Sequence, residues 1–337
     1  MKAVVLVGGE GTRLRPLTET IPKPLLPLVD RPFLDHVLDH LTRFGVDEVL
    51  LSSPYLGEVF EAYVRARRGA PRVTWVTEHE PLGTGGAIAN TAASLSEAFF
   101  VLNGDILTDL DLGELWAFHR ANDAMATITL THVQDARPFG LVDLDERGSV
   151  LAFREKPSEL VPGFVNAGTY VLEPGAIAGV DPGRAVSVER EIFPSLIGSG
   201  APVFGFVADA YWMDLGTPAK YLRATFEVLE GSVSGMAAAA PYVDPSADIA
   251  LTAQIGRWVV AQPDVRIEDG AEVDDSVLLA GSVVRAGARV RESILGPGSV
   301  VEAGATVVGA VLAEGARVPA GSVAEGARVS AGQALEA

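Results

Sequence analysis

The stretch GGEGTRLRPLTETIPKPLLPL, residues 8–28, directly follows MKAVVLV, an apolar run with the length and valine content of a buried parallel strand. Three glycines open the stretch and allow a tight turn whose backbone N–H groups point at one place, as phosphate-binding turns do. Arg13 and Lys23 add positive charge, and four prolines stiffen the segment, so that little entropy is lost when an anion docks. The stretch therefore predicts an anion-binding arm after the first strand.

Two common nucleotide-binding motifs do not fit this turn. A Walker A loop needs a lysine followed by serine or threonine directly after its second glycine, and none stands there. A dinucleotide fingerprint needs a third glycine where the chain has Leu14. A purely structural turn would explain the glycines but not the paired cations.

Strand-like and helix-like segments alternate over the first 135 residues. The expected strands are 3–7, 46–53, 72–78, 98–105 and 125–133. A first helix is expected to begin with Asp30 as N-cap and Pro32 in its first turn, and to end at Gly45. Further helices are expected at 57–68, 86–96 and 112–122. This alternation predicts an α/β fold of the Rossmann-like type: a mostly parallel mixed sheet flanked by helices, with ligands at the carboxyl ends of its strands.

The pattern changes between residues 136 and 245. GLVDLDERGSVLAFREKP predicts a hairpin turning near residues 147–148, and FVNAGTYVLEP and VFGFVAD predict further strands of the same sheet. Residues 217–231 return to a helical pattern, and 231–245 are weakly patterned. We therefore predict a first domain at 1–232 and a linker at 233–250.

The tail repeats every seventeen residues. Two glycine columns keep this period: Gly270, Gly287, Gly304 and Gly321, and Gly281, Gly298, Gly315 and Gly332. A small residue at each corner with Val or Ile between is typical of a solenoid in which each coil buries its apolar side chains against the next. Internal spacings near six predict a left-handed parallel β-helix of the hexapeptide type over 251–337, with about four coils.

Composition limits the possible partners. The net charge of −18 argues against nucleic acid and against an anionic membrane surface. The chain has no cysteine, no apolar stretch of 18 residues and no secretory layout at its N-terminus. We therefore expect a cytoplasmic protein that binds any anion through a local cationic site.

The motifs resemble those of one enzyme family. GGEGTRLRPLT followed by PKPLLP resembles the signature of the sugar-1-phosphate nucleotidyltransferases, and further matches follow in order along the chain. They are PLGTGGAI (81–88), LNGDIL (102–107), FG (139–140), REKP (154–157), NAGTYVL (166–172), SVEREIFP (187–194) and YWMDLGTPAKYL (211–222). With its hexapeptide tail, the set is most similar to bacterial mannose-1-phosphate guanylyltransferases.

The resemblance implies a reaction in which a nucleoside triphosphate and a sugar 1-phosphate form an NDP-sugar and diphosphate, here most closely GTP and mannose 1-phosphate. A phosphate monoester is mostly dianionic at neutral pH, because its second pKa is about 6. No general base is therefore required, and catalysis reduces to bringing two anions together and stabilising charge at phosphorus.

The resemblance also implies roles for residues that match the family motifs. The expected catalytic residues are Arg13, Lys23, Asp105 and Asp214, of which the two aspartates would bind Mg²⁺. The expected nucleotide-binding residues are Gly8, Gly9, Gly11, Thr12, Arg13, Lys23, Leu82, Gly83, Thr84, Gly85 and Asp105. The expected sugar-phosphate residues are Gly140, Glu155, Lys156, Asn166 and Gly168. Glu189 fits a site residue and a solvated helix face about equally well.

Other functions remain open at this point. The sugar could be glucose 1-phosphate, a heptose phosphate or a cyclitol phosphate, with another nucleoside triphosphate. A second, acyltransferase activity in the tail is disfavoured, because such sites usually use a histidine and the tail has none. A non-catalytic paralogue that binds NDP-sugar would be expected to lack a cation or a metal carboxylate, and all are present. The flat faces of the tail suit assembly, so we expect a homo-oligomer.

Overall fold

The computed structural model describes residues 1–337 except 79, 94, 182, 237 and 337. The chain forms two compact units. Unit 1 comprises Met1–Gly9 and Val37–Trp212, and unit 2 comprises Glu10–His36 and Met213–Ala337. The glycine- and proline-rich arm at 10–36 thus belongs with the C-terminal part of the chain. Among the described residues, no helix has both the length and the apolar character needed to cross a bilayer.

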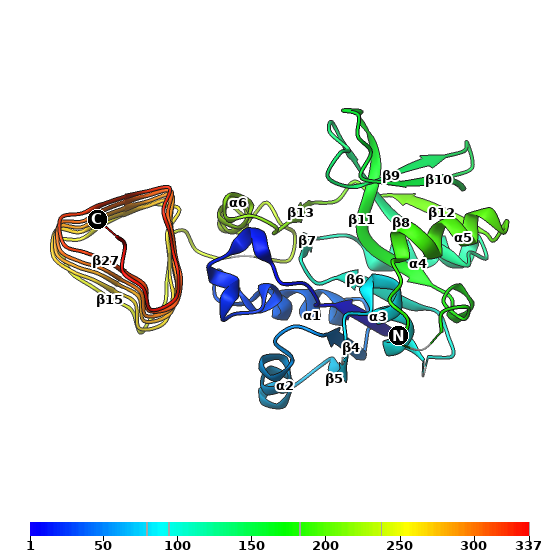
Figure 1. Ribbon diagram of the computed structural model, residues 1–337, viewed down its shortest axis with the longest axis horizontal. Coiled ribbons are helices and arrows are strands. Elements are labelled where there is room, and N and C mark those ends of the chain that lie inside the picture. The colour runs from blue at the N-terminus through cyan, green and yellow to red at the C-terminus, as the bar shows by residue number, and fades with distance from the viewer. Residues whose placement is uncertain (79, 94, 182, 237, 337) are drawn as a thin grey trace. The chain divides into compact units, whose positions relative to one another are not determined.

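Unit 1 is built on a nine-stranded mixed sheet (Figure 1). Its parallel part consists of β1 (Lys2–Leu6), β4 (Glu48–Ser53), β5 (Arg72–Thr77) and β6 (Phe99–Asn103). Its remaining strands are β8 (Ala126–Val133), β9 (Gly140–Leu144), β10 (Val150–Glu155), β11 (Gly163–Leu172) and β12 (Val203–Val207). β11 runs antiparallel to β6, β8 and β9, and β9 and β10 form the predicted hairpin. The predicted mostly parallel mixed sheet is therefore confirmed, with the order β10-β9-β11-β6-β1-β4-β5. Off this path, β8 also pairs with β11, and β12 pairs with β8.

Helices follow most strands of the sheet. They are α1 (Phe33–Arg43), α2 (Gly57–Ala66), α3 (Gly83–Ala92), α4 (Leu112–Ala121) and α5 (Phe193–Gly198), with a π-helical turn at Val188–Ile192. The sequence predicts Asp30 as the N-cap of this first helix and Pro32 in its first turn, and both predictions are wrong, because α1 begins only at Phe33. Instead, the short strands β2 (Pro27–Leu28) and β3 (Arg31–Pro32) pair, and the Asp30 N–H donates to Leu28 O at 3.0 Å. Because Arg31 and Pro32 are part of this ladder, the helix begins only at Phe33.

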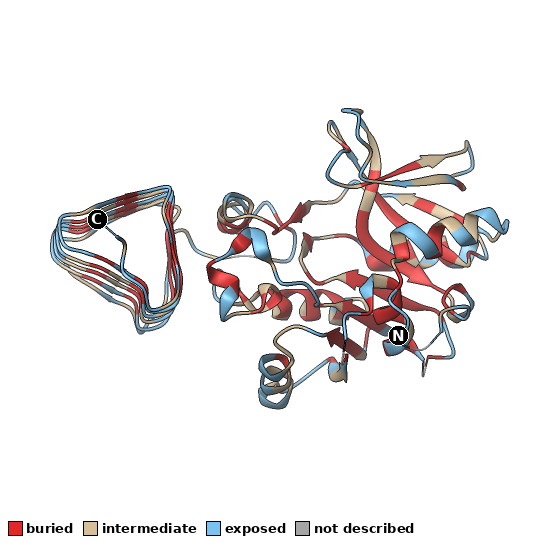
Figure 2. Cartoon of the chain, viewed as in Figure 1, coloured by how far each residue is buried: buried red, intermediate tan, exposed pale blue. Residues whose placement is uncertain are grey.

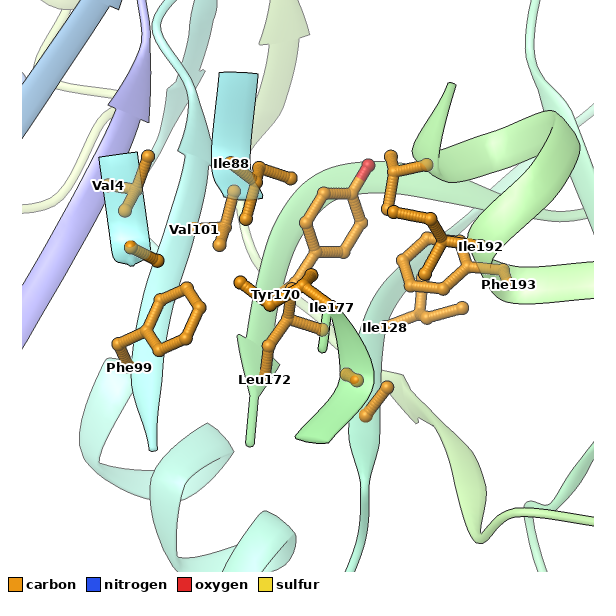
Figure 3. Packing of buried hydrophobic residues seen from close by; sticks show 14 of the residues in the cluster. Val4, Ile88, Phe99, Val101, Ile128, Tyr170, Leu172, Ile177, Ile192 and Phe193 are labelled. Atoms are coloured by element: carbon orange, nitrogen blue, oxygen red, sulfur yellow. The ribbon is translucent and has the colours of Figure 1, made fainter. Parts of the chain in front are cut away.

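The core of unit 1 lies between the sheet and its helices. Tyr170 on β11 is fully buried, and its ring meets Phe193 edge-on with centroids 5.2 Å apart. Figure 3 shows Ile88 of α3 and Val101 of β6 beside the same ring. Each such side chain contributes about 1.5–3 kcal/mol when it leaves water. Figure 2 shows that this buried layer follows the strands that carry the loops described below.

The arm in unit 2 is a series of tight turns. They are the 3₁₀ turns Thr12–Leu14, Leu17–Glu19 and Lys23–Leu25, followed by the β2–β3 ladder. Three of the arm's backbone carbonyls accept hydrogen bonds from side chains far along the chain. The Tyr221 hydroxyl of α6 (Pro218–Leu229) donates to Pro27 O, the buried Gln262 amide to Val29 O at 3.0 Å, and the Arg328 guanidinium to Arg15 O.

The tail of unit 2 is a parallel β-helix whose coils appear in cross-section in Figure 1. One ladder contains β14 (Tyr242–Val243), β17 (Val260–Ala261), β20 (Val277–Leu278), β23 (Ile294–Leu295), β26 (Val311–Leu312) and β29 (Arg328–Val329). The second contains β15 (Asp248–Ile249), β18 (Arg266–Ile267), β21 (Val283–Val284), β24 (Val300–Val301) and β27 (Arg317–Val318). The third contains β16 (Gln254–Ile255), β19 (Glu272–Asp274), β22 (Arg289–Arg291), β25 (Thr306–Val308) and β28 (Val323–Glu325). Short strands outside these sheets are β7 (Ile106–Thr108) and β13 (Trp212–Asp214).

The seventeen-residue period places one apolar column on the inside of each ladder. In the second ladder Ile267, Val284, Val301 and Val318 are all buried and stack in register. The first ladder already begins at Tyr242, within the segment 233–250. Tyr242 pairs with Val260, eighteen residues on, whereas later steps are seventeen. Because of this extra residue, and because its corners lack glycine, the first coil does not follow the seventeen-residue period in the sequence.

The third corner of the coils offers a stability prediction. Asp275 and Glu292 have φ of 44° and 48° where the next two coils have Gly309 and Gly326. An L-residue in this left-handed region costs about 1–2 kcal/mol. Exposed Glu292 replaced by glycine is therefore expected to stabilise the chain by about 1 kcal/mol, measured as a higher midpoint in urea or heat. Glu292→Ala is the control, because it removes the same charge but keeps the φ. Equal midpoints for the two variants would contradict the backbone explanation.

Candidate active site

A cavity of about 260 Å³ lies at the carboxyl ends of β1, β4 and β5 in unit 1. Its walls are Leu6, Gly8, Gly9, Ser52, Pro54, Glu78, Pro81, Leu82, Gly83, Thr84 and Ala87. Five predicted nucleotide-binding residues, Gly8, Gly9, Leu82, Gly83 and Thr84, thus meet at one place. The position agrees with the rule that open α/β sheets bind ligands beyond the carboxyl ends of their strands.

The glycines of the PLGTGG loop are explained by packing against residues 184–188. The N–H groups of Gly85 and Gly86 donate to Val186 O at 2.8 and 3.2 Å. A Cβ on Gly83 would lie 2.7 Å from that oxygen, and one on Gly86 would lie 2.5 Å from Arg184 O. Two N–H groups of the first turn of α3, those of Gly85 and Gly86, are therefore bonded within the protein. Gly85, a predicted nucleotide-binding residue, packs against this segment, whereas Leu82–Thr84 line the cavity.

Thr84 connects this loop to the π-helical turn. Its hydroxyl donates to Glu189 Oε2 at 2.7 Å and accepts the N–H of Val188 at 2.9 Å. Ser187 Oγ donates to the same Glu189 oxygen at 2.7 Å. Glu189 therefore holds the loop in place, and it is a structural partner of Thr84.

Three predicted sugar-phosphate residues meet at the open end of the β9–β10 hairpin. Gly140 pairs directly with Glu155, and a Cβ on Gly140 would lie 2.5 Å from the Phe153 ring and 2.9 Å from Glu155 Oε2. The N–H of Lys156 donates to Phe139 O at 2.9 Å, and its exposed ammonium lies 3.7 Å from Glu155 Oε1. Burial raises the pKa of Glu155, and the nearby Glu189 carboxylate raises it further.

The other two predicted sugar-phosphate residues lie on the neighbouring strand β11. β9 pairs with β11 at Leu141 and Val165, one residue from Gly140 and Asn166. Asn166 Oδ1 accepts the Gly168 N–H at 2.8 Å, and its amide donates to the Tyr170 hydroxyl at 2.7 Å. All five predicted sugar-phosphate residues are thus brought to one end of three adjacent strands.

Gly168 also connects this group to the strand that carries Asp105. Its φ is 76°, and a Cβ there would lie 2.7 Å from the Asn103 amide at the end of β6. Half-buried Asp105 follows two residues later, after Gly104, whose N–H donates to Leu6 O at 2.8 Å. Asp105 therefore stands at the same carboxyl edge of the sheet, as predicted.

Trp212 borders the sugar-phosphate residues and was not predicted. Its indole N–H donates to Ala167 O at 2.9 Å, between Asn166 and Gly168, and its ring meets Phe139 edge-on with centroids 5.2 Å apart. It therefore fixes the backbone of β11 next to two site residues. The available signal was the aromatic pair YW just before Asp214, which the sequence analysis used only as part of the motif at 211–222.

The remaining predicted residues lie in unit 2. Gly11 has φ of 58°, its carbonyl accepts the Thr18 hydroxyl at 2.9 Å, and the stem of Lys23 packs beside it. Thr12 and Arg13 are exposed in the following 3₁₀ turn. The stem of Lys23 thus lies beside Gly11, directly before the turn that carries Thr12 and Arg13. Arg15 pairs instead with Glu10 at 2.6 Å.

Gly216 brings Arg13 close to Asp214. A Cβ on Gly216 would lie 2.6 Å from both the Arg13 guanidinium and Asp214 Oδ1. The Gly216 N–H donates to that oxygen at 3.2 Å, and the Lys220 ammonium pairs with the other oxygen of the carboxylate. Asp214 is buried, so these donors orient a carboxylate that has little contact with water.

Asp105 and Asp214 carry donor groups of the kind that magnesium prefers. Among the described residues, no group of three or more His, Cys, Asp or Glu side chains is placed to hold a metal. Mg²⁺ usually takes one or two carboxylates, substrate phosphates and water. Asp105 and the oriented Asp214 supply hard oxygen ligands of this kind, so the chemistry of the donors suits magnesium.

Gly216→Ala is expected to lower kcat/KM about tenfold without unfolding the chain, because the new methyl group would displace the mobile end of Arg13 from Asp214. The measurement is steady-state diphosphate release together with a thermal midpoint. Gly198→Ala is the matched control, since its Cβ would meet nothing within 4 Å. Wild-type kinetics for Gly216→Ala would show that the approach of the two groups is unimportant.

Glu78 and Ser52 in the cavity were also missed by the sequence analysis. Each is a polar residue at or just after the end of an apolar strand, β5 and β4 respectively, and both are buried. Polar side chains at the carboxyl ends of adjacent parallel strands were the available signal. Recognising it requires knowing that β4 and β5 are neighbours, which the sequence does not state.

Two family models match the chain. Residues 2–231 match the nucleotidyl transferase family, and residues 238–337 match the GMPPB C-terminal domain. The chain is 40% identical to a mannose-1-phosphate guanylyltransferase of Mycobacterium tuberculosis, over 84% of this chain and 82% of that protein. It is 35% identical to the catalytic subunit beta of the Danio rerio mannose-1-phosphate guanylyltransferase, over 85% and 83% of the two chains.

A solved structure shares the fold of the first part. HddC from Yersinia pseudotuberculosis, in complex with GMP-PN, is 31% identical with a TM-score of 0.57. The match covers 66% of this chain and 97% of HddC.

Proposed function

Because the chain belongs to the nucleotidyl transferase family, we propose that it is a mannose-1-phosphate guanylyltransferase, which converts GTP and mannose 1-phosphate into GDP-mannose and diphosphate. The similarity to enzymes of that name over more than four-fifths of both chains is the observation that carries the proposal. The GMPPB-type tail supports it independently.

The proposed reaction is an in-line displacement at phosphorus. A phosphate oxygen of mannose 1-phosphate attacks the α-phosphorus of GTP, a new P–O bond forms, and the bond to the oxygen bridging the α- and β-phosphates breaks. Diphosphate leaves with the electron pair of that bond. The attacking oxygen already carries negative charge at neutral pH, so no side chain has to remove a proton.

In this proposal each group of residues binds one part of the substrates. The turn Gly8–Lys23 binds the triphosphate, with Arg13 and Lys23 as its cations. Lys156 binds the sugar phosphate, and Glu155, Asn166 and the backbone at Gly140 and Gly168 bind the sugar. The assignment of the sugar-phosphate residues is supported by their position at one end of the adjacent strands β10, β9 and β11.

Asp105 and Asp214 are the proposed ligands of Mg²⁺. When bound, the metal supplies positive charge for the phosphate oxygens. The hydrogen bond from Gly216 and the ion pair with Lys220 hold the Asp214 carboxylate in one orientation, which lowers the entropy lost on ligation.

We also propose that residues 1–232 form the catalytic domain, that the protein acts in the cytoplasm, and that the β-helix makes it a homo-oligomer. Light scattering of the purified chain measures the oligomeric state, and a monomer at working concentrations would contradict the last proposal.

A substrate matrix tests the proposed function. Purified protein is incubated with magnesium, one of four nucleoside triphosphates and one of mannose 1-phosphate, glucose 1-phosphate, a heptose 1-phosphate or a cyclitol phosphate, and diphosphate is measured. We expect the highest kcat/KM for GTP with mannose 1-phosphate. Preference for another pair would overturn the substrate assignment, and absence of turnover with every pair would favour a non-catalytic protein.

A further inference from the structure

We propose that Glu78 selects guanine, by accepting hydrogen bonds from N1–H and from the 2-amino group of the base. The inference rests on the proposed use of GTP and deepens it, because it names the side chain that would choose the base. It is drawn from the cavity at the carboxyl ends of β1, β4 and β5.

The cavity suits one base. Its volume of about 260 Å³ lies just below the usual range for ligand sites, which begins at about 300 Å³. Leu6, Leu82, Pro54 and Pro81 supply apolar walls for the faces of a flat ring. Gly8 and Gly9 form the side from which the phosphate-binding turn continues along the chain. A nucleotide whose phosphates approach the backbone at Gly8 and Gly9 can therefore place its base here.

Glu78 is the acidic side chain of the cavity lining, and it is held in a fixed orientation. It is buried, with 8% of its surface exposed. The Ser52 hydroxyl donates to Oε1 at 2.5 Å, and the Leu82 N–H approaches Oε2 at 3.4 Å. Each carboxylate oxygen can accept about two hydrogen bonds, so both keep capacity toward a ligand.

The partners of Glu78 are neutral. No cationic side chain lies within ion-pair distance of its carboxylate in the part of the chain that the structure describes. A buried carboxylate with incomplete hydrogen bonding is costly, and it strongly favours a ligand that brings donors. The Glu78 carboxylate therefore favours a base whose edge carries hydrogen-bond donors.

Guanine alone among the four common bases has two adjacent donors on its Watson–Crick edge. Adenine and cytosine place an acceptor nitrogen beside their amino group, and uracil places its single N–H between two carbonyl oxygens. A carboxylate facing any of these three meets at least one acceptor, and that pair repels. A site built around hydrogen bonds rejects a ligand that leaves them unmade far more strongly than an apolar site does.

The experiment compares GTP with ITP, which keeps N1–H and lacks the 2-amino group. Diphosphate release with mannose 1-phosphate gives kcat/KM for both nucleotides in wild type and in Glu78→Gln. In wild type we expect GTP to exceed ITP by about 10- to 100-fold, since one donor to a carboxylate is lost. In Glu78→Gln we expect kcat/KM for GTP to fall about 100-fold and the GTP:ITP ratio to fall toward one.

Controls separate this role from packing and from the proposed function. Ser52→Ala removes only the orienting hydroxyl and should keep the GTP:ITP ratio well above one. If Glu78→Gln does not fold by circular dichroism, Glu78→Asp, with its carboxylate withdrawn, should show the same fall in ratio. Wild-type preference for a base other than guanine would defeat the proposed function. Wild-type preference for GTP with an unchanged ratio in the variant would defeat only the role of Glu78.

Discussion

Asp214→Asn is expected to abolish nucleotidyl transfer, with kcat reduced about 1,000-fold and the fold retained. The proposed magnesium contributes several kcal/mol of charge stabilisation, and an amide oxygen is a much weaker ligand than a carboxylate. Asn has nearly the same size, so the buried site keeps its packing. The measurements are kcat at increasing magnesium concentrations and the thermal midpoint. Asp105→Asn is expected to behave in the same way.

The ion pair with Lys220 provides the necessary control for Asp214. If Asp214 acted only by neutralising Lys220, then Lys220→Gln, which breaks the same pair, would be as damaging as Asp214→Asn. We expect Lys220→Gln to keep most of the activity, because it leaves the carboxylate intact. Exposed Asp209→Asn controls for a change of net charge. Wild-type rates in Asp214→Asn would show that the metal assignment is wrong.

Lys156→Ala is expected to raise KM for mannose 1-phosphate by about 10- to 100-fold, because a charge-assisted hydrogen bond to the phosphate is lost. KM for GTP should change little. The ammonium is exposed, so its removal leaves packing almost unaffected. The measurement is a pair of saturation curves, one for each substrate, at constant magnesium.

Arg154→Ala is the matched control for Lys156, because it removes an exposed positive charge two residues earlier on β10. Arg154 pairs with Asp143 at 2.8 Å, across the hairpin. If both variants raised KM for the sugar phosphate equally, the effect would come from the general electrostatic field. An equal rise in KM for both substrates in Lys156→Ala would instead point to a distorted site.

The sequence predicts much of the fold, because its signals are local. The alternation of apolar strands and amphipathic helices fixes the parallel part of the sheet, and Gly148 marks the turn of the β9–β10 hairpin. Asp30 fails as an N-cap because a ladder between β2 and β3 takes up the preceding residues. That ladder depends on how the arm packs, which no local pattern reveals.

The candidate site also contains residues that the sequence predicts and residues that only the structure reveals. Motif residues such as Gly140 and Glu155 are recognisable, and the structure explains them by direct cross-strand pairing. The sequence analysis assigns no role to Glu78 or Gly216, although Gly216 lies in the motif at 211–222. The first matters because three strands end beside it, and the second because two side chains approach its missing Cβ. Both facts belong to tertiary structure.

The hydrogen bonds to the arm have a consequence for the order of folding. Val29 O and Arg15 O receive their donors from residues 233 and 313 positions later. Contacts of such sequence separation form late, because the loop that they close is long. During synthesis, the turn that carries Arg13 can gain the hydrogen bond from Arg328 only after residue 328 has left the ribosome. A chain truncated before Arg328 would lack this donor, and its arm would be held by fewer hydrogen bonds.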